Sequence, residues 1–178
     1  MASGGIDSTA CINFYLNRHY KVLPLFVRYG QPACTAENRS ILAVCKHFGL
    51  RPRVLSVTGF SGLRSGEQCG RNLFLVSVAM MATQGSTNII SMGIHSGTQY
   101  FDCGADFARK TESMVSSYTD GRVTFGSPFL NWTKQDVFKY CMDSDVPVDL
   151  TWSCEASSKK PCGRCLSCRD RERLLACA

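Results

Sequence analysis

Short β-rich runs alternate with longer helical periods along this chain, and the alternation constrains the fold more than any other feature. The β-rich runs are Val22–Tyr29, Val54–Val57, Ile89–Gly93 and Val123–Phe125. The helical periods are Asp7–Arg18, Thr35–Phe48, Asn72–Thr83, Asp106–Ser117 and Thr133–Asp143. Strands that alternate with helices are typical of an α/β domain with a largely parallel sheet. We therefore predict this fold class, and we expect the strongly apolar helix Asn72–Thr83 to be buried.

The length of 178 residues, with 44% hydrophobic and 19% charged residues, suits one compact domain spanning residues 1–178. No apolar run approaches the roughly 20 residues of a membrane-spanning helix, so we predict a soluble protein with no membrane partner. The net charge of +6 favours phosphate-bearing partners but falls short of a dedicated nucleic-acid binder.

Eleven cysteines stand out in the composition. An odd number without a signal peptide argues against a secreted disulfide framework and for reduced thiols in the cytoplasm. Seven are scattered, and we expect these to be small residues without chemistry; they are Cys11, Cys34, Cys45, Cys69, Cys103, Cys141 and Cys177.

The other four cysteines crowd into the segment 150–178, at positions Cys154, Cys162, Cys165 and Cys168. Four thiolates at this spacing can close a tetrahedron around a structural zinc ion, with no place left for water. Basic side chains surround the cluster and offset its negative charge: Lys159, Lys160, Arg164, Arg169, Arg171 and Arg173. The alternatives are four free buried cysteines, a redox pair, or a zinc module that binds nucleic acid.

A second chemical signal lies at the start of the chain, in Ser3-Gly4-Gly5-Ile6-Asp7-Ser8-Thr9. Two glycines allow a tight turn, hydroxyl groups add donors, and the N-terminus of the following helix attracts anions. The segment can therefore cradle phosphate, although a simple turn with a Ser or Asp cap stays open. It lacks the lysine of a P-loop and the third glycine of a dinucleotide fingerprint.

Further motifs join these two signals into a family resemblance. They are Tyr29-Gly30-Gln31, Arg71-Asn72, Met92-Gly93, Tyr100-Phe101-Asp102-Cys103, Trp132-Thr133-Lys134, Leu150-Thr151-Trp152-Ser153-Cys154 and Pro161-Cys162-Gly163-Arg164-Cys165-Leu166-Ser167-Cys168-Arg169. In this order, over nearly the whole chain, they resemble the 7-cyano-7-deazaguanine synthases of the PP-loop ATP-pyrophosphatase superfamily. The resemblance implies the fold of the adenine-nucleotide alpha hydrolases, which is Rossmann-like with helices on both faces of a parallel sheet.

The resemblance also implies an enzyme, an ATP-dependent carbon–nitrogen ligase with magnesium as cofactor. Such an enzyme adenylates the carboxylate of 7-carboxy-7-deazaguanine, and an amine then attacks. With ammonia the product is an amide, which a second ATP-driven step dehydrates to the nitrile used in queuosine synthesis. The resemblance further suggests a homodimer or a complex with a partner protein.

The site residues implied by the family fall into three groups. The ATP-binding residues would be Ser3, Gly4, Gly5, Asp7, Ser8, Thr9, Tyr29, Gly30, Gln31, Asn72 and Gly93. The catalytic residues would be Asp7, as a magnesium contact, with Lys134 and Arg71 as positive charges, and the substrate pocket would hold Tyr100, Phe101 and Asp102. Plainer roles stay open, since Asp7 and Thr9 can cap a helix, Lys134 can be solvated, and aromatic residues can simply pack.

The chain is more compact than is usual for the family. Met1 and Ala2 alone precede Ser3, so either the start is cut back or the sheet lacks its usual first strand, and the loop Thr58–Gly70 is short. The shortening suggests a site open to a polypeptide, in which the activated deazaguanine is passed to a protein amine. Relatives in bacterial antiphage defence make this alternative reasonable. A tRNA-modifying enzyme and a non-enzymatic zinc module that binds nucleic acid are further alternatives.

Overall fold

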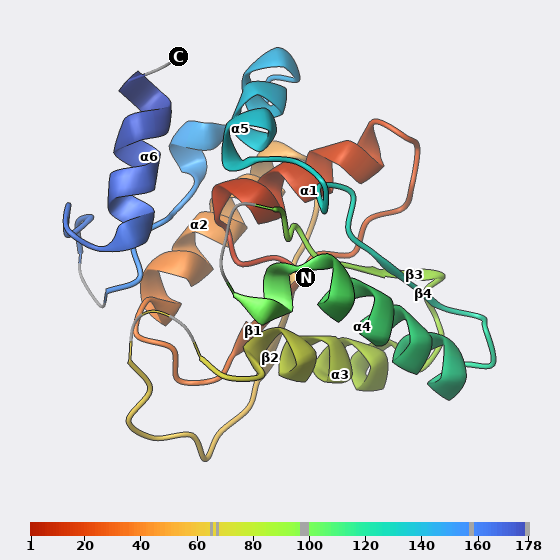
Figure 1. The fold of residues 1–178 in the computed structure, drawn as a ribbon. Helices are drawn as coiled ribbons and strands as arrows, with labels where there is room; N and C mark the ends of the chain where they lie inside the picture. The colour runs from red at the N-terminus through yellow and green to blue at the C-terminus, as the bar shows by residue number, and fades with distance from the viewer. Residues whose placement is uncertain (65, 67, 97–99, 157–158, 177–178) are drawn as a thin grey trace.

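Helices and strands alternate in the computed structural model, which describes residues 1–64, 66, 68–96, 100–156 and 159–176 (Figure 1). The helices are α1 (Ile6–Leu16), α2 (Cys34–His47), α3 (Arg71–Thr83), α4 (Ala105–Tyr118), α5 (Lys134–Asp143) and α6 (Leu166–Ala176), with the short 3-10 turns η1 (Phe101–Cys103) and η2 (Val148–Leu150). The strands are β1 (Leu25–Arg28), β2 (Arg53–Ser56), β3 (Ile89–Ser91) and β4 (Thr124–Gly126). The predicted α/β class is confirmed.

The strands pair in parallel, β1 with β2 and β3 with β4. The first two residues of the chain touch both pairs: the Ala2 amide donates to Leu25 O at 2.9 Å, and the Met1 nitrogen donates to Ser91 O at 2.6 Å. Ser91 is the last residue of β3, so the carboxyl end of β3 lies beside the start of the loop at Ser3, at the edge of a parallel sheet where ligands bind.

The residues of β1 alternate between two layers of helices. Leu25 and Val27 are buried in one core with α3 and α4, whereas Phe26 is buried in another with α1 and α2. Because successive side chains of a strand point to opposite faces, helices cover both faces of the sheet, as predicted. A third core joins α1, α5 and α6 through residues that include Ala10, Val137 and Leu174.

The expectation that the helix beginning near Asn72 is buried is wrong for much of its surface. Asn72, Val76 and Ala79 form the buried stripe of α3, while Leu73 and Met81 are 39% and 77% exposed. The reason is that α3 packs against the sheet along one stripe of its surface only, so apolar side chains outside that stripe stay exposed.

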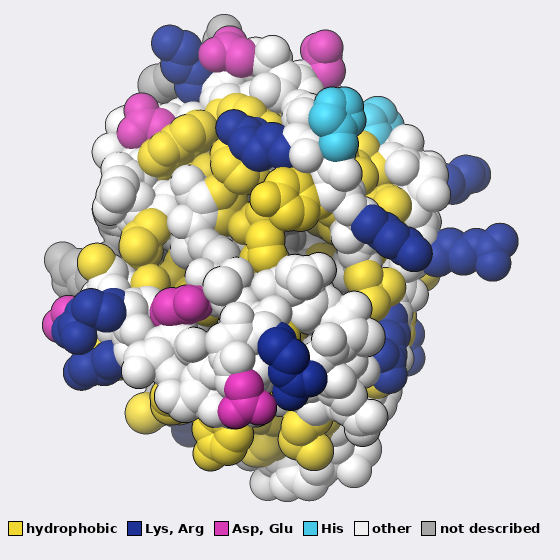
Figure 2. All heavy atoms as spheres, turned by 90° about the vertical axis from the view of Figure 1, so that its right-hand side faces the viewer, with side chains coloured by type: hydrophobic (Ala, Val, Ile, Leu, Met, Phe, Trp, Pro, Cys, Tyr) yellow, Lys and Arg dark blue, Asp and Glu magenta, His cyan; other side chains and the backbone are white. Residues whose placement is uncertain are grey.

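Charges are mixed on the surface. On the face in Figure 2, Lys and Arg side chains are dispersed among acidic and hydrophobic ones. No helix among the described residues is long and apolar enough to cross a membrane. Cys177, one of the scattered cysteines, lies outside the described residues.

Candidate active site

The sequence-predicted site residues gather around one cavity of about 630 Å³. Its wall includes the starts of α1, α3 and α5, the ends of β1 and β3, and one side of α6. The predicted residues that line it are Ser3, Gly5, Asp7, Ser8, Tyr29, Gln31, Arg71, Asn72, Gly93, Tyr100 and Lys134. Five predicted residues lie outside this lining, namely Gly4, Thr9, Gly30, Phe101 and Asp102.

The predicted phosphate loop, residues 3–9, turns sharply at Gly4, whose φ of 78° is strained for any residue with a side chain. A Cβ there would also lie 2.8 Å from the Ile41 nitrogen. Gly5 is the N-cap of α1, in an extended conformation and with no side-chain cap among the described residues. The first-turn amides of α1 are therefore available as donors to an anion, and Gly5, Asp7 and Ser8 line the cavity.

Hydroxyl groups brace this loop from inside. The Ser3 and Ser8 oxygens lie 3.2 Å apart, and Ser8 donates to Gly5 O at 3.0 Å. The Thr9 hydroxyl is buried and donates to the same carbonyl at 2.9 Å. Ser3 and Ser8 line the cavity, whereas Thr9 shapes the loop from behind.

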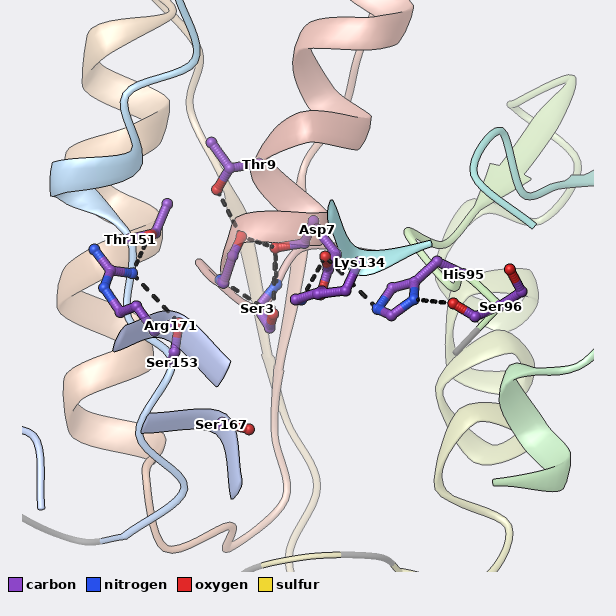
Figure 3. Close-up of polar contacts among 12 residues, drawn as sticks. Ser3, Asp7, Thr9, His95, Ser96, Lys134, Thr151, Ser153, Ser167 and Arg171 are labelled. Atoms are coloured by element: carbon purple, nitrogen blue, oxygen red, sulfur yellow. Dashed lines mark hydrogen bonds and ion pairs between the residues drawn. The ribbon is translucent and has the colours of Figure 1, made fainter. Parts of the chain in front are cut away.

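Lys134 and Asp7, which both line the cavity, form an ion pair (Figure 3). The Lys134 Nζ donates to Asp7 Oδ1 at 2.6 Å. A reciprocal capping box fixes where α5 begins, because Thr133 Oγ1 accepts from the Asp136 amide and the Asp136 carboxylate accepts from the Thr133 amide. Lys134 is thus held in the first turn of a helix, where a positive charge is unfavourable unless an anion faces it.

His95 approaches the Asp7 carboxylate as well, and it was not predicted from the sequence as a site residue. It is buried, its Nδ1 donates to Ser96 O at 2.7 Å, and its Nε2 lies 3.9 Å from Asp7 Oδ1 (Figure 3). Its place just past the carboxyl end of β3 was the available signal, because ligands bind at that edge.

Gly93 lies between β3 and α1, where their backbones come close. A Cβ at this position would overlap the Asp7 carbonyl, 2.7 Å from its carbon. Gly93 therefore sets how near the ion pair lies to the sheet edge.

Gln31 is locked by three hydrogen bonds. Its Nε2 donates to Val27 O and to Glu37 Oε2, both at 3.0 Å, and its Oε1 accepts from the Tyr29 amide at 2.9 Å. Glu37 lines the cavity and was also missed. Burial raises the pKa of its carboxyl group, while the bond from Gln31 works in the opposite direction.

The implied nucleobase pocket is divided in the structure. Tyr100 lines the cavity, whereas Phe101 is 61% exposed. The Lys110 Nζ lies over the Phe101 ring, 5.3 Å from its centre. The Asp102 carboxylate accepts from the Asn72 amide at 3.3 Å, and Asn72 Nδ2 donates to Asp102 O at 2.9 Å. Asp102 thus stabilises the start of α3.

The four clustered cysteines come together and could hold a metal ion. Their sulfur atoms all lie within 4.8 Å of one another. The Cys165 amide donates to Cys162 Sγ at 3.4 Å, and backbone donors from Arg164 and Cys165 lower the pKa of the Cys162 thiol to about 6. Four sulfur ligands this close to one another suit a closed, structural metal site.

The side of α6 that follows this cluster forms part of the cavity wall, which the sequence did not predict. Its cavity-lining residues are Leu166, Ser167, Asp170, Arg171, Arg173 and Leu174. Ser167 donates to Glu155 Oε1 at 2.6 Å, which ties the start of α6 to the preceding segment.

Comparison with known proteins agrees with this geometry. The sequence profile described as "Queuosine biosynthesis protein QueC" matches residues 1–67 and 68–177. A 7-cyano-7-deazaguanine synthase of Prochlorococcus marinus (strain MIT 9515) is 28% identical over 202 residues, covering 97% of this chain and 90% of that protein. The 7-cyano-7-deazaguanine synthase 1 of Desulfitobacterium hafniense (strain Y51) is 29% identical over 198 residues, covering 97% and 88%.

Among solved structures, an NMN synthetase from Francisella tularensis aligns with a TM-score of 0.43 and 15% identity, covering 83% of this chain and 61% of that one. The fold, the phosphate loop and the family match define a PP-loop enzyme. Within that class, the chain belongs to the QueC family of queuosine biosynthesis proteins. The resemblance found in the sequence is confirmed, and with it the expectation of an enzyme.

Proposed function

We propose that this chain uses ATP to activate the carboxylate of 7-carboxy-7-deazaguanine for attack by ammonia. A carboxylate oxygen bonds to the α-phosphorus, the bond to pyrophosphate breaks, and ammonia then displaces AMP to give the amide. A second ATP-driven step dehydrates the amide to the nitrile. The observation that carries the proposal is the meeting of the phosphate loop and Lys134 in one cavity of a QueC family chain.

The charge in this cavity suits the chemistry. Adenylation spreads negative charge over the α-phosphate and the departing pyrophosphate, and stabilising it requires positioned donors and cations. The α1 amides, Ser3 and Ser8 would supply donors, and Lys134 and Arg71, which both line the cavity, would supply positive charge. Gly4 and Thr9 would hold the shape of the loop.

Magnesium fits this arrangement through Asp7. A carboxylate is a hard oxygen ligand of the kind that magnesium accepts together with substrate phosphates. In the structure that carboxylate faces Lys134, so we propose that Lys134 turns to the phosphates when Asp7 takes the metal. Magnesium would then neutralise phosphate charge.

Recognition of the nucleobase would centre on Tyr100, which offers an aromatic face inside the cavity. Phe101 and Asp102 adjoin it through η1. To stack on the base and to accept from its amidine edge, these two side chains would have to turn toward the cavity.

Zinc is the proposed occupant of the cysteine cluster. Four soft thiolates form the ligand set that zinc takes in structural sites, and backbone amides already point at the sulfur atoms. The ion would hold the start of α6 in place.

We further propose that residues 1–178 form one domain, with 150–178 as its metal-binding segment. The first and last of the described segments share the wall of one cavity, which supports this assignment. A homodimer or a partner protein would cover apolar side chains that α3 and α4 leave exposed, such as Met81 and Tyr118.

The decisive experiment incubates purified enzyme with ATP, magnesium, 7-carboxy-7-deazaguanine and ammonium, and follows AMP, pyrophosphate and products by mass spectrometry. We expect the amide and the nitrile, and loss of both with Asp7→Asn. If ATP is not consumed in a substrate-dependent way, the proposal fails.

The same experiment tests the amine acceptor when candidate partner proteins are added. A protein adduct of deazaguanine mass, with no free amide or nitrile, would show that the acceptor is a protein amine and not ammonia. If the wild type and Asp7→Asn bind nucleic acid equally well and neither consumes ATP, the result would support the zinc module instead.

A further inference from the structure

The segment from Val148 to Ser153 supports the phosphate loop from behind. The Trp152 amide donates to Gly4 O at 2.9 Å. The Ser40 hydroxyl lies 2.7 Å from the same carbonyl and 2.8 Å from Leu150 O, so it bridges the loop and the segment. The carbonyl of Gly4 is thus fixed from two sides, and the turn that exposes the α1 amides depends on this supporting segment.

Arg171 holds the supporting segment against α6 (Figure 3). Its Nη1 donates to Thr151 Oγ1 at 2.7 Å and to Ser153 Oγ at 3.3 Å. Its Nη2 donates to Val148 O at 2.8 Å. The guanidinium is half-buried, and this burial lowers its pKa. One side chain therefore contacts three residues of the segment, through the two terminal nitrogens of a planar guanidinium.

This geometry argues against Arg171 as a direct ligand of substrate. Both terminal nitrogens are used on the supporting segment, although the side chain also lines the cavity. Its effect on the site passes through Thr151 and Trp152 to Gly4. α6 also contains Cys168 of the cysteine cluster, so the cluster helps to fix where α6 places the Arg171 guanidinium.

We propose that Arg171 is a positioning residue that clamps the segment 148–153 onto α6 and so keeps the phosphate loop in the shape that binds pyrophosphate. The inference rests on the proposed function, since it assumes that this loop binds phosphate groups. It assigns to the C-terminal helix a part in nucleotide binding as well as in holding a metal.

The test measures binding of magnesium pyrophosphate by isothermal titration calorimetry for wild type, Arg171→Lys and Arg171→Ala. Because lysine keeps the charge but has one terminal nitrogen in place of the two that make these bonds, we expect both variants to bind at least about tenfold more weakly. Arg169→Lys and Arg169→Ala are matched controls on the same helix, with an exposed side chain, and should change the affinity less than about twofold. Metal content and circular dichroism report whether each variant keeps its fold.

A second variant covers the case in which Arg171 substitutions unfold the chain. Thr151→Val removes one acceptor of the Arg171 guanidinium at nearly constant volume, and we expect it to weaken binding several-fold with the metal retained. If Arg171→Lys binds with wild-type affinity, the clamp is overturned and a simple charge effect is indicated. Unchanged binding by folded Thr151→Val would also overturn the clamp. Wild-type protein that binds no pyrophosphate would instead overturn the proposed function together with this inference.

Discussion

The ammonium group of Lys134 lies 2.6 Å from the Asp7 carboxylate, which joins the start of α5 to the first turn of α1. The two residues are 127 positions apart in the chain. Their pairing neutralises a lysine in the first turn of a helix and keeps its charge beside the phosphate loop. Under the proposed function, a phosphate group of ATP would compete with Asp7 for this lysine.

Replacing this lysine should affect catalysis far more than folding. We expect Lys134→Ala to lower kcat/KM for ATP-dependent product formation by about two orders of magnitude, because a positioned cation is lost from a developing anionic transition state. Release of pyrophosphate measures the effect. Lys139→Ala, an exposed lysine of the same helix, should leave the rate near wild type. Equal losses in the two variants would contradict the assigned role.

Gly93 should be intolerant of any side chain. A methyl group there would meet the Asp7 carbonyl, which is backbone and cannot swing aside. We expect Gly93→Ala to lower the free energy of unfolding in urea by about 3 kcal/mol, at the upper end of overpacking costs. Gly104→Ala is the comparison, since its Cβ would lie 3.5 Å from the nearest atom, and it should cost under about 1 kcal/mol. Similar losses at both positions would show that the close approach is relieved by backbone movement.

Loss of one cysteine of the cluster should remove the metal. We expect Cys168→Ser to reduce bound zinc well below one ion per chain and to lower the free energy of unfolding by at least about 2 kcal/mol, because metal binding is coupled to folding. Elemental analysis and urea unfolding measure the two effects. Cys69→Ser, at an exposed cysteine outside the cluster, should change neither.

Glu37 should make stability depend on pH. Burial raises the pKa of this carboxyl group in the folded state above its ordinary value of 4.5. The folded chain therefore binds the proton more tightly than the unfolded chain, and the stability that protonated Glu37 contributes is lost as pH rises through the folded-state pKa. We expect Glu37→Gln to gain stability relative to wild type at pH 7, and the gain to shrink toward pH 4. Glu172→Gln, on the exposed side of α6, should show no such trend. Urea unfolding at several pH values is the measurement.

Much of the fold could be predicted from local patterns. The helix period placed α2 and α4 to within one residue at each end, because their apolar faces repeat regularly. The strand predicted at Val22–Tyr29 is longer than the ladder Leu25–Arg28, because the apolar run continues past the residues that pair with β2. Hydrophobicity marks burial and not hydrogen bonding.

The candidate site was predictable only where residues are close in sequence or follow a family pattern. The phosphate loop and the cysteine cluster are both local. Glu37 and Arg171 were missed because a single polar residue on a helix gives no local sign of the partner it meets in space. For His95, the one signal was its place just past the carboxyl end of β3. The orientation of Phe101 toward solvent was equally hidden, since an aromatic residue in a loop can face either way.

The cavity is lined both by the loop that begins at Ser3 and by α6, which lie far apart in the sequence. Ser8 and Arg171 both line it, although 163 positions separate them. Because the loop is synthesised well before α6, a nascent chain can form β1 and α2 before it has a finished binding site. Contacts of such high sequence separation form late in folding. A chain terminated before α6 would thus carry the loop at Ser3 without the Arg171 clamp that we propose to hold its shape.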